Sequence, residues 1–301
     1  MTAPLVSVVI PLYKSAGTLG ACLESLSAQT FSDFESILID SSPTDETRAL
    51  AESFPKAVYI HVERRMLPQA ARNFGAARAH GSLLAFTDPD ILPEPSWLSE
   101  LVASHRGRPA IIFGPIACLG RRWVDVGVHF TKFSICLPRG ASRSVRLGWS
   151  GNVLIDRTVF SKLGGWEESR TQGDSVFSAR ADAAGFELRF EPRAVVSHDH
   201  EGISVQALAK ERFRRGREFA QIEASGELGA PPRSRFGVLL LPLRLFSGAW
   251  RIVRYAAQSG MLLDLIWASP VVAVGLVSWY AGLAAGMLAA AAPAHDAGRA
   301  G

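Results

Sequence analysis

The chain has 301 residues, of which 48% are hydrophobic and 20% are charged, and its formal net charge is +4. This length is enough for one large domain, or for one domain with an appendage. A charge this small does not predict nucleic acid as a partner. Three cysteines, Cys22, Cys118 and Cys136, show no metal-ligand spacing, and their odd number disfavours a disulfide framework and favours a reducing compartment.

Strands and helices alternate through the first part of the chain. The short apolar run at the N-terminus has no basic start, so it predicts a buried strand rather than a signal peptide. We predict strands at 5–11, 34–40, 57–62, 83–87 and 110–116, and helices at 18–29, 44–54, 68–80 and 93–105. Such alternation predicts an α/β fold with right-handed crossovers and a mostly parallel sheet flanked by helices.

The periodic pattern weakens from Ala117 to Trp149, a region that we expect to be irregular and to face an acceptor molecule. Beyond it, the sequence predicts a strand at 151–157, a short helix at 157–166, an amphipathic helix at 173–185, one or two strands within 186–200 and a helix at 204–224.

The composition changes after Pro231 and Pro232. The segment 236–250 is apolar apart from Arg244, and the segment 265–293 has no charged residue and is long enough to span a bilayer. Basic residues gather at 210–217 and recur beside the apolar segments, which favours an anionic membrane surface as a partner. A buried helical hairpin is the alternative. We divide the chain into a domain over residues 1–230 and a membrane-associated helical region of apolar helices over residues 231–301.

Polar side chains follow three of the predicted strands. Tyr13, Asp40 and the pair Asp88 and Asp90 lie at or just beyond strand ends, where ligands bind in open parallel sheets. In an extended segment, residues two apart point to the same side, and Pro89 favours an extended Asp88. The stretch "LLAFTDPDILPEP" is therefore either a turn that closes a buried strand or a pair of carboxylates that face one cation.

Six segments in this order resemble the family 2 glycosyltransferases, which have the GT-A fold. They are "VSVVIPLYKSAGTLGACLESLSAQT", "ILIDSSPTDET", "QAARNFGAARAHGSLLAFTDPDI", "GNVLIDRTVFSKLGGWEE", "GDSVFSARADAAG" and "EPRAVVSHDH". The resemblance covers roughly residues 5–218. It implies a nucleotide-sugar donor and an acceptor that receives the sugar.

The resemblance places the donor at five residues. Pro11 and Tyr13 would wall the base, since an aromatic ring offers a stacking face, and Asp40 would contact the nucleoside. Arg72 would pair with the diphosphate or hold the acidic loop, and Asp88 would lie beside the donor. Loop packing, a cap at the end of the second strand and a solvated arginine are the structural alternatives.

Asp88 and Asp90 match the family's Asp-x-Asp, and Asp90 is the expected direct ligand of a divalent cation, Mn²⁺ or Mg²⁺. Hard divalent cations prefer carboxylate oxygen, and a diphosphate leaving group needs its charge neutralised. His198 resembles the histidine that completes this metal site, with His200 as the second choice.

Asp174 resembles the family's catalytic base, which takes a proton from the acceptor hydroxyl as that hydroxyl attacks the anomeric carbon. A first-turn acid that is favoured by the helix dipole is a compatible alternative. Gly173 stands where the family usually has Glu, which puts the positioning of Asp174 and the acceptor contacts in question.

Trp149, Asn152 and Trp166 lie in surroundings that resemble the family's acceptor region, although core packing would explain the tryptophans equally well. The Gln-x-x-Arg-Trp signature of processive members is absent, and "ERFRRGREF" stands in its place, so single addition is expected. The implied enzyme moves a sugar from a nucleotide donor, expected to be a UDP-sugar, to a lipid-linked or glycan acceptor with inversion, at the cytoplasmic face of the cell membrane. The alternatives are a nucleotidyltransferase and a membrane-anchored nucleotide-sugar binder without turnover.

Overall fold

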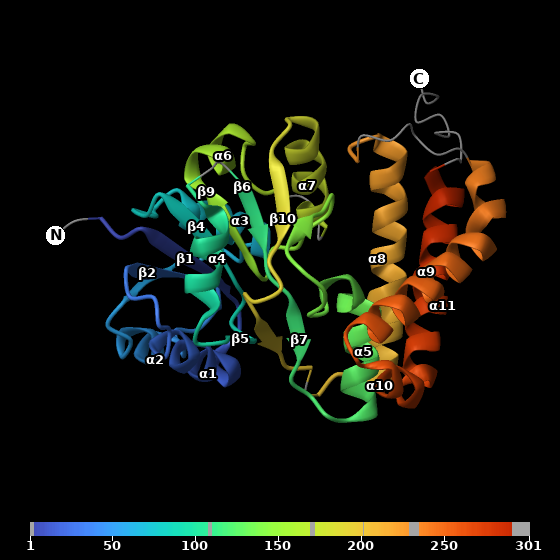
Figure 1. The fold of residues 1–301 in the computed structure, drawn as a ribbon, viewed down its shortest axis with the longest axis horizontal. Helices are drawn as coiled ribbons and strands as arrows, with labels where there is room; N and C mark the ends of the chain where they lie inside the picture. Colours follow the sequence, from blue (N-terminus) through green and yellow to red (C-terminus); the bar gives the residue numbers. More distant parts are fainter. Residues whose placement is uncertain (1–2, 108–109, 169–171, 201, 229–234, 291–301) are drawn as a thin grey trace, which may run out of the picture. The chain divides into compact units, whose positions relative to one another are not determined.

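A computed structural model describes residues 3–107, 110–168, 172–200, 202–228 and 235–290 (Figure 1). The chain forms two compact units. The sheet unit comprises Met1–Arg121 and Ile135–Glu201, and the helical unit comprises Arg122–Ser134 and Gly202–Gly301.

The sheet unit is built around an eight-stranded sheet of order β3-β2-β1-β4-β9-β6-β10-β8. Strands β1 to β4, β6 and β10 run in one direction, whereas β9 is antiparallel to β4 and β6, and β8 is antiparallel to β10. The strands are β1 (Val6–Leu12), β2 (Phe34–Asp40), β3 (Ala57–His61), β4 (Leu83–Phe86), β6 (Ala110–Phe113), β8 (Arg143–Ser144), β9 (Val153–Asp156) and β10 (Glu187–Phe190). All seven residues of β1 are buried, as a strand covered on both faces requires.

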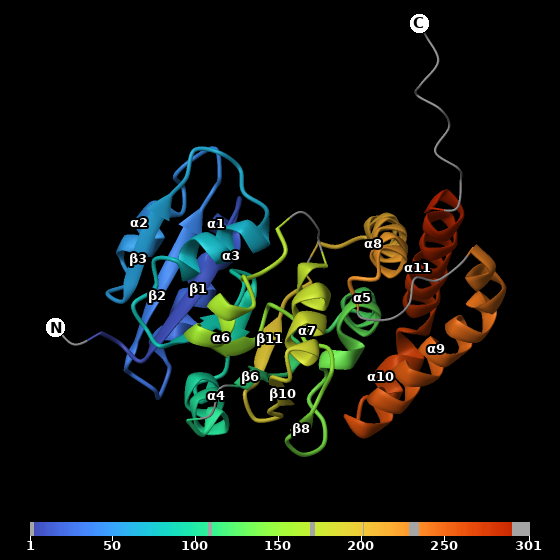
Figure 2. The same cartoon turned by 90° about the horizontal axis from the view of Figure 1, so that it is seen from above.

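Helices flank this sheet, and the mostly parallel arrangement expected from the sequence is confirmed (Figures 1 and 2). The helices of the unit are α1 (Ala16–Ser27), α2 (Arg48–Glu52), α3 (Pro68–Ala76), α4 (Trp97–His105), α6 (Arg157–Lys162) and α7 (Gly173–Ala183). A short helix η1 (Ser134–Cys136) contains the point in the chain at which one unit ends and the other begins. Helix α3 lies so close to β1 and β2 that a side chain at Gly75 would meet Val9 and Ile39.

A second, three-stranded sheet of order β5-β11-β7 brings distant parts of the chain together. It consists of β5 (Ile91–Pro93), β7 (Ile116–Cys118) and β11 (Val196–His198). His198 is paired with Ile91 on one side and with Cys118 on the other. The segment that follows β4 therefore lies next to the histidine-containing end of β11.

The helical unit contains α5 (Trp123–Phe133), α8 (Val205–Ser225), η2 (Arg235–Leu240), α9 (Leu241–Gln258), α10 (Leu262–Trp267) and α11 (Ser269–Ala290). By its contacts α8 groups with the C-terminal helices, although the sequence-based division placed it in the domain over residues 1–230. Within the described residues, one stretch, Ser269–Ala289, is long and apolar enough to cross a membrane.

Several predicted elements need correction. The region expected to be irregular contains α5, whose first turn is held by Asp125, which accepts hydrogen bonds from the backbone and guanidinium of Arg122. The strand predicted at 110–116 divides into β6 and β7 because Gly114 lies against the carbonyl of Ala194 and Pro115 has no amide hydrogen. The helix predicted to start at residue 93 starts at Trp97, because Pro93 still belongs to β5 and Ser96 is the N-cap of the helix.

Candidate active site

The acidic loop after β4 meets the end of β11. The distance from Asp90 Oδ2 to His198 Nε2 is 3.5 Å, and the backbone amide of Asp199 donates to the carbonyl oxygen of Asp90 at 3.5 Å. The rings of His198 and His200 are stacked, with centroids 4.3 Å apart. The structure therefore brings Asp90 and His198 together, and it places His200 directly behind His198.

Arg72 and Asp88 form a largely buried ion pair. Arg72 Nη2 donates to Asp88 Oδ1, and Arg72 Nη1 donates to Gln69 Oε1 at 3.2 Å. Burial raises the pKa of Asp88, the charge of Arg72 opposes this, and the nearby carboxylate of Asp90 raises the pKa further, so that it lies above its ordinary value. Of the two roles considered for Arg72, this conformation shows the one in which it holds the acidic loop.

Asp90 is the more accessible of the two carboxylates, since 42% of its side chain is exposed against 28% for Asp88. Among the described residues, no group of three or more His, Cys, Asp and Glu side chains is arranged to hold a metal. Asp90 and His198 still offer one oxygen and one nitrogen donor side by side. The Asp90 carboxylate suits a hard divalent cation, because such a cation is usually bound through one or two carboxylates together with substrate phosphates.

The loop after β1 carries Tyr13, whose ring is partly exposed. The guanidinium of Arg65 lies 4.4 Å from the centroid of this ring. The backbone amide of Lys14 donates to Ser42 Oγ at 2.7 Å, which ties the loop after β1 to the loop after β2. Pro11 is buried inside β1. The ring of Tyr13 is therefore exposed enough to stack on a base, whereas Pro11 is a buried strand residue.

Asp40 is completely buried at the end of β2. Its oxygens accept hydrogen bonds from Ser42 N at 2.8 Å, from Tyr59 Oη at 2.9 Å and from Thr47 Oγ1. Burial raises the pKa of Asp40, but these hydrogen bonds outweigh it and bring the pKa below its ordinary value. In this conformation Asp40 caps the strand end. Its contact with a nucleoside stays a prediction, and it requires a hydrogen bond from the nucleoside to replace one of these three.

Asp174 lies in the first turn of α7, where its Oδ1 accepts a hydrogen bond from Ser175 N at 2.9 Å. A side chain at Gly173 would collide with the carbonyl oxygen of Glu167 and would press on Gln69. The glycine is therefore needed for the close approach of this loop to α7. The departure from the family's usual Glu has a packing reason here, and Asp174 keeps its place at the helix start.

Trp149, Asn152 and Trp166 are all buried. Asn152 Oδ1 accepts from Trp97 Nε1 at 2.8 Å, and Asn152 Nδ2 donates to two backbone carbonyls at 2.8 and 2.9 Å. Trp149 Nε1 donates to the carbonyl oxygen of Gly114 at 2.9 Å, and the Trp166 ring lies 4.4 Å from that of Phe177. Core packing, the alternative for the tryptophans, describes all three side chains, and neither tryptophan offers an open ring face to a sugar.

Gln69 is a site residue that the sequence did not single out. Besides accepting from Arg72, it donates from Nε2 to Ser150 Oγ at 3.4 Å and lies against Gly173. It thus links the first turn of α3 to Ser150 and to the start of α7, and it meets the acidic loop through Arg72. The only sequence signal was its position three residues before Arg72, which places both side chains on one face of the helix.

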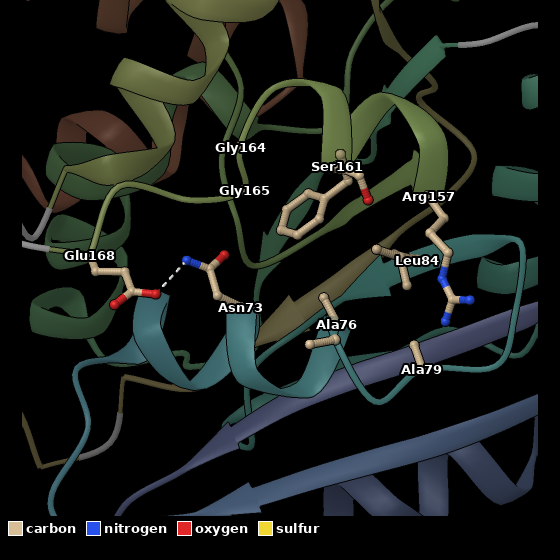
Figure 3. A pocket seen from close by; sticks show the side chains of 11 residues that line it. Asn73, Ala76, Ala79, Leu84, Arg157, Ser161, Gly164, Gly165 and Glu168 are labelled. Atoms are coloured by element: carbon tan, nitrogen blue, oxygen red, sulfur yellow. Dashed lines mark hydrogen bonds between the residues drawn. The ribbon is translucent and has the colours of Figure 1, made fainter.

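A separate pocket is lined by Asn73 and Ala76 of α3 and by Ser161 of α6 (Figure 3). Asn73 brackets Trp166 by donating from Nδ2 to its carbonyl oxygen at 2.9 Å and accepting from its amide at 2.8 Å, and it also donates to Glu168 Oε1 at 2.7 Å. The pocket extends to Leu84 and Arg157, near the start of β4. None of the predicted site residues is among those that line it.

Sequence comparison finds a family model, described as glycosyl transferase family 2, that matches residues 7–163. The chain is 26% identical over 230 residues to glycosyltransferase AglE of Haloferax volcanii, covering 73% of this chain and 75% of that protein. It is 30% identical over 233 residues to the O-antigen biosynthesis protein RfbC of Myxococcus xanthus, covering 68% of this chain but 18% of that protein. It is also 37% identical over 166 residues to a PGL/p-HBAD biosynthesis glycosyltransferase of Mycobacterium bovis, covering 54% of this chain and 57% of that protein.

Solved structures share the fold along nearly the whole chain. The mannosyltransferase PcManGT from Pyrobaculum calidifontis, solved in complex with GDP-Man and Mn²⁺, superposes with a TM-score of 0.58 at 20% identity and covers 97% of this chain and 87% of its own. TarS of S. aureus, solved in complex with UDP-GlcNAc, superposes with a TM-score of 0.56 at 13% identity. The match covers 92% of this chain and 90% of the TarS chain.

Proposed function

Because this chain belongs to glycosyl transferase family 2 and is a glycosyltransferase with the GT-A fold, we propose that it moves a sugar from a nucleotide-diphosphate donor to an acceptor hydroxyl with inversion. The observation that carries the proposal is the meeting of Asp90 and His198 beside the Arg72–Asp88 pair, at the carboxyl end of β4. This is the edge at which open parallel sheets bind their ligands.

The donor's diphosphate would lie at this edge. Asp90 and His198 would hold a divalent cation, Mn²⁺ or Mg²⁺, with Asp88 close by, and PcManGT with its bound Mn²⁺ supports this assignment. When bound, such a cation neutralises the negative charge that develops on the leaving diphosphate. Arg72 fixes Asp88 and so keeps the acidic loop in place for the donor.

Asp174 would act as the general base. Its carboxylate takes the proton of the acceptor hydroxyl while that oxygen bonds to the anomeric carbon, and the bond from this carbon to the diphosphate oxygen breaks on the opposite face. The hydrogen bond from Ser175 N orients one oxygen of Asp174. The nucleoside diphosphate is released, and the sugar is transferred with inverted configuration.

A UDP-sugar is the proposed donor, with Pro11, Tyr13 and Asp40 near the nucleoside. TarS with bound UDP-GlcNAc supports this choice, while PcManGT with GDP-Man makes GDP-sugars the comparison to test. The proposed acceptor is lipid-linked or a glycan, in keeping with the O-antigen biosynthesis named for RfbC. We place the enzyme at the cytoplasmic face of the cell membrane.

The test is a panel of UDP-, GDP- and other nucleotide-sugars, each with and without Mn²⁺ or Mg²⁺. A ligand that binds the folded state alone must raise the melting temperature by mass action. We expect one donor class to do so with metal, and release of the nucleoside diphosphate once an acceptor is added. Asp90→Asn should remove the metal-dependent part of the shift. Release of pyrophosphate from a nucleoside triphosphate would instead support the nucleotidyltransferase.

A further inference from the structure

Helix α11, the one described helix that could cross a membrane, lies side by side with α8 (Figures 1 and 2). The contact is close along both helices. A side chain at Gly216 of α8 would collide with the carbonyl oxygen of Trp279, and a side chain at Gly282 of α11 would collide with that of Phe213. A side chain at Gly286 would meet Arg217 and Ala220. The small residues therefore pack α11 onto α8, inside one unit.

Helix α8 is strongly charged. Its charged residues are Lys210, Glu211, Arg212, Arg214, Arg215, Arg217, Glu218 and Glu223. Some form ion pairs inside the helical unit, such as Glu211 with Lys132 of α5 at 3.3 Å and Glu223 with Arg244 of α9 at 2.8 Å. A bilayer crossing by α11 would carry these charges toward the hydrocarbon, where each is costly. The apolar composition of α11 is thus not enough to make it a span.

Helix α9 exposes an apolar row. Leu243, Phe246, Trp250, Val253 and Ala257 follow one another at spacings of three and four residues, so they share one face. All five are exposed, and Phe246 reaches 68%. The opposite face is the buried one, and its residues are Leu241, Gly248, Ile252 and Ala256.

Large apolar side chains are also exposed just before and just after α9 in the chain. Leu239 and Leu240 lie just before it, and α10 exposes Leu263, Ile266 and Trp267, with Leu263 reaching 81%. Exposure of so many large apolar side chains is unusual for a soluble surface, and it marks an interaction site. We call the row of α9 together with these α10 residues the apolar edge.

Positive charge borders the apolar edge. By helical spacing Arg254 lies next to Trp250 and Ala257, and Arg251 lies one turn before it. Both arginines are exposed, and neither has an ion-pair partner among the described residues. A helix with an apolar face, flanking arginines and exposed tryptophan matches the chemistry of an anionic bilayer surface.

We propose that the helical unit binds the surface of an anionic lipid bilayer through the apolar edge, with α9 in the plane of the interface and α11 not crossing it. The proposal specifies the membrane association included in the proposed function. It does not depend on the transfer reaction.

Vesicle sedimentation of the full chain tests the surface. We expect binding to vesicles of phosphatidylcholine with phosphatidylglycerol, and much weaker binding to phosphatidylcholine alone. The double variant Phe246→Ser with Trp250→Ser should lose most of the binding, and Arg251→Gln and Arg254→Gln should each weaken it by about fivefold. Val58→Ser, which changes an exposed apolar residue of the sheet unit, is the matched control and should bind normally.

Two results would overturn the surface assignment. One is unchanged vesicle binding by the Phe246 and Trp250 double variant. The other is a dimer, seen by light scattering, that this variant dissociates while vesicles have no effect, because the apolar edge would then be an interface between copies. The donor-dependent thermal shift is measured on the same variants, so a failure of this proposal is distinguishable from a failure of the proposed function.

Topology is tested with an impermeant maleimide. A cysteine replacing Thr2 and a cysteine added after Gly301 are labelled separately in sealed, inverted vesicles from expressing cells, in a Cys118→Ser background, since Cys22 and Cys136 are buried. Labelling of both ends from the same side is expected. Labelling of the two ends from opposite sides would show that the chain crosses the membrane and would overturn the in-plane arrangement.

Discussion

The pair of Arg72 and Asp88 makes a quantitative prediction for Arg72→Gln. Arg72 is almost completely buried, and its guanidinium is shared between Asp88 and Gln69. The substitution removes the cation and leaves the Asp88 carboxylate in surroundings that still exclude most water. Removing one partner of a buried ion pair costs about 3–5 kcal/mol. Because the Asp88 side chain keeps 28% of its exposure, the lower end applies, at about 3 kcal/mol.

Arg48→Gln is the matched control. Arg48 also pairs with carboxylates, those of Asp45 at 3.3 Å and Glu52 at 3.7 Å, but 45% of its side chain is exposed. Exposed ion pairs contribute about 0–1 kcal/mol. The same chemical change should therefore lower the free energy of unfolding by less than about 1 kcal/mol at this position.

The cost of Arg72→Gln should depend on pH. Burial and Asp90 already raise the pKa of Asp88, and the loss of Arg72 removes an influence that lowers it. The folded-state pKa of Asp88 then lies above its unfolded value, so the folded variant takes up a proton first as the pH falls. The penalty is complete above the folded pKa and shrinks as the pH falls toward the unfolded pKa. We expect the gap to the parent chain to be smaller in acid than at neutral pH.

Urea unfolding of the parent chain, Arg72→Gln, Asp88→Asn and the double variant measures these quantities. The two single changes should not add, since each removes the same interaction. A loss for Arg72→Gln no larger than that for Arg48→Gln would refute the reasoning, and so would additive effects in the double variant.

Three further predictions concern the site and its frame. Asp174→Asn should lower kcat by about 10²–10⁴-fold while the donor-dependent thermal shift persists, and full turnover would move the base elsewhere. Asn152→Ala removes three buried hydrogen bonds and should lower the free energy of unfolding by about 3 kcal/mol. A decrease in this free energy no larger than that caused by substituting an exposed residue would contradict the prediction. Gly173→Ala should destabilise the fold by about 1–3 kcal/mol, because the added side chain would collide with the Glu167 carbonyl oxygen. Gly20→Ala has open space around it and should stabilise its helix by up to about 1 kcal/mol. Melting temperatures that shift in the same direction for both variants would count against the packing argument.

Local sequence patterns were enough to predict the strands and helices whose apolar spacing is regular over a few consecutive residues. The strand Phe34–Asp40 has the bounds expected from its apolar run, and α1 buries the apolar face that its spacing predicts. Helix α5 escaped prediction because its apolar face is defined by partners far along the chain, such as Val271 of α11, which lies against Gly127. The three-residue strand β5 carries too little sequence for a pattern, and its pairing with β11 forms it. Strand β11 lies within 186–200, where one or two strands were predicted.

The site shows the same division. The motifs identified Asp90 and His198, and the fold confirms that they are neighbours, although they are separated by more than a hundred residues. Residue type could not tell whether Trp149 and Trp166 stack on a sugar or on other rings, because burial depends on what surrounds them. The ion pair of Arg72 with Asp88 also needed the tertiary structure, since it joins α3 to a loop beyond β4.

The sequence by itself determined the family, the α/β fold and the position of Asp88 and Asp90 after a strand, because each follows from the order of the motifs and the spacing of nearby residues. It also determined that residues 265–293 carry no charge. Only the tertiary structure decided that this apolar segment breaks into α10 and α11 and that α11 lies along the charged helix α8. The physical reason is that hydropathy describes the transfer of a single helix from water to a bilayer. A helix that is packed on another helix must enter the bilayer together with its partner's charges or stay outside it.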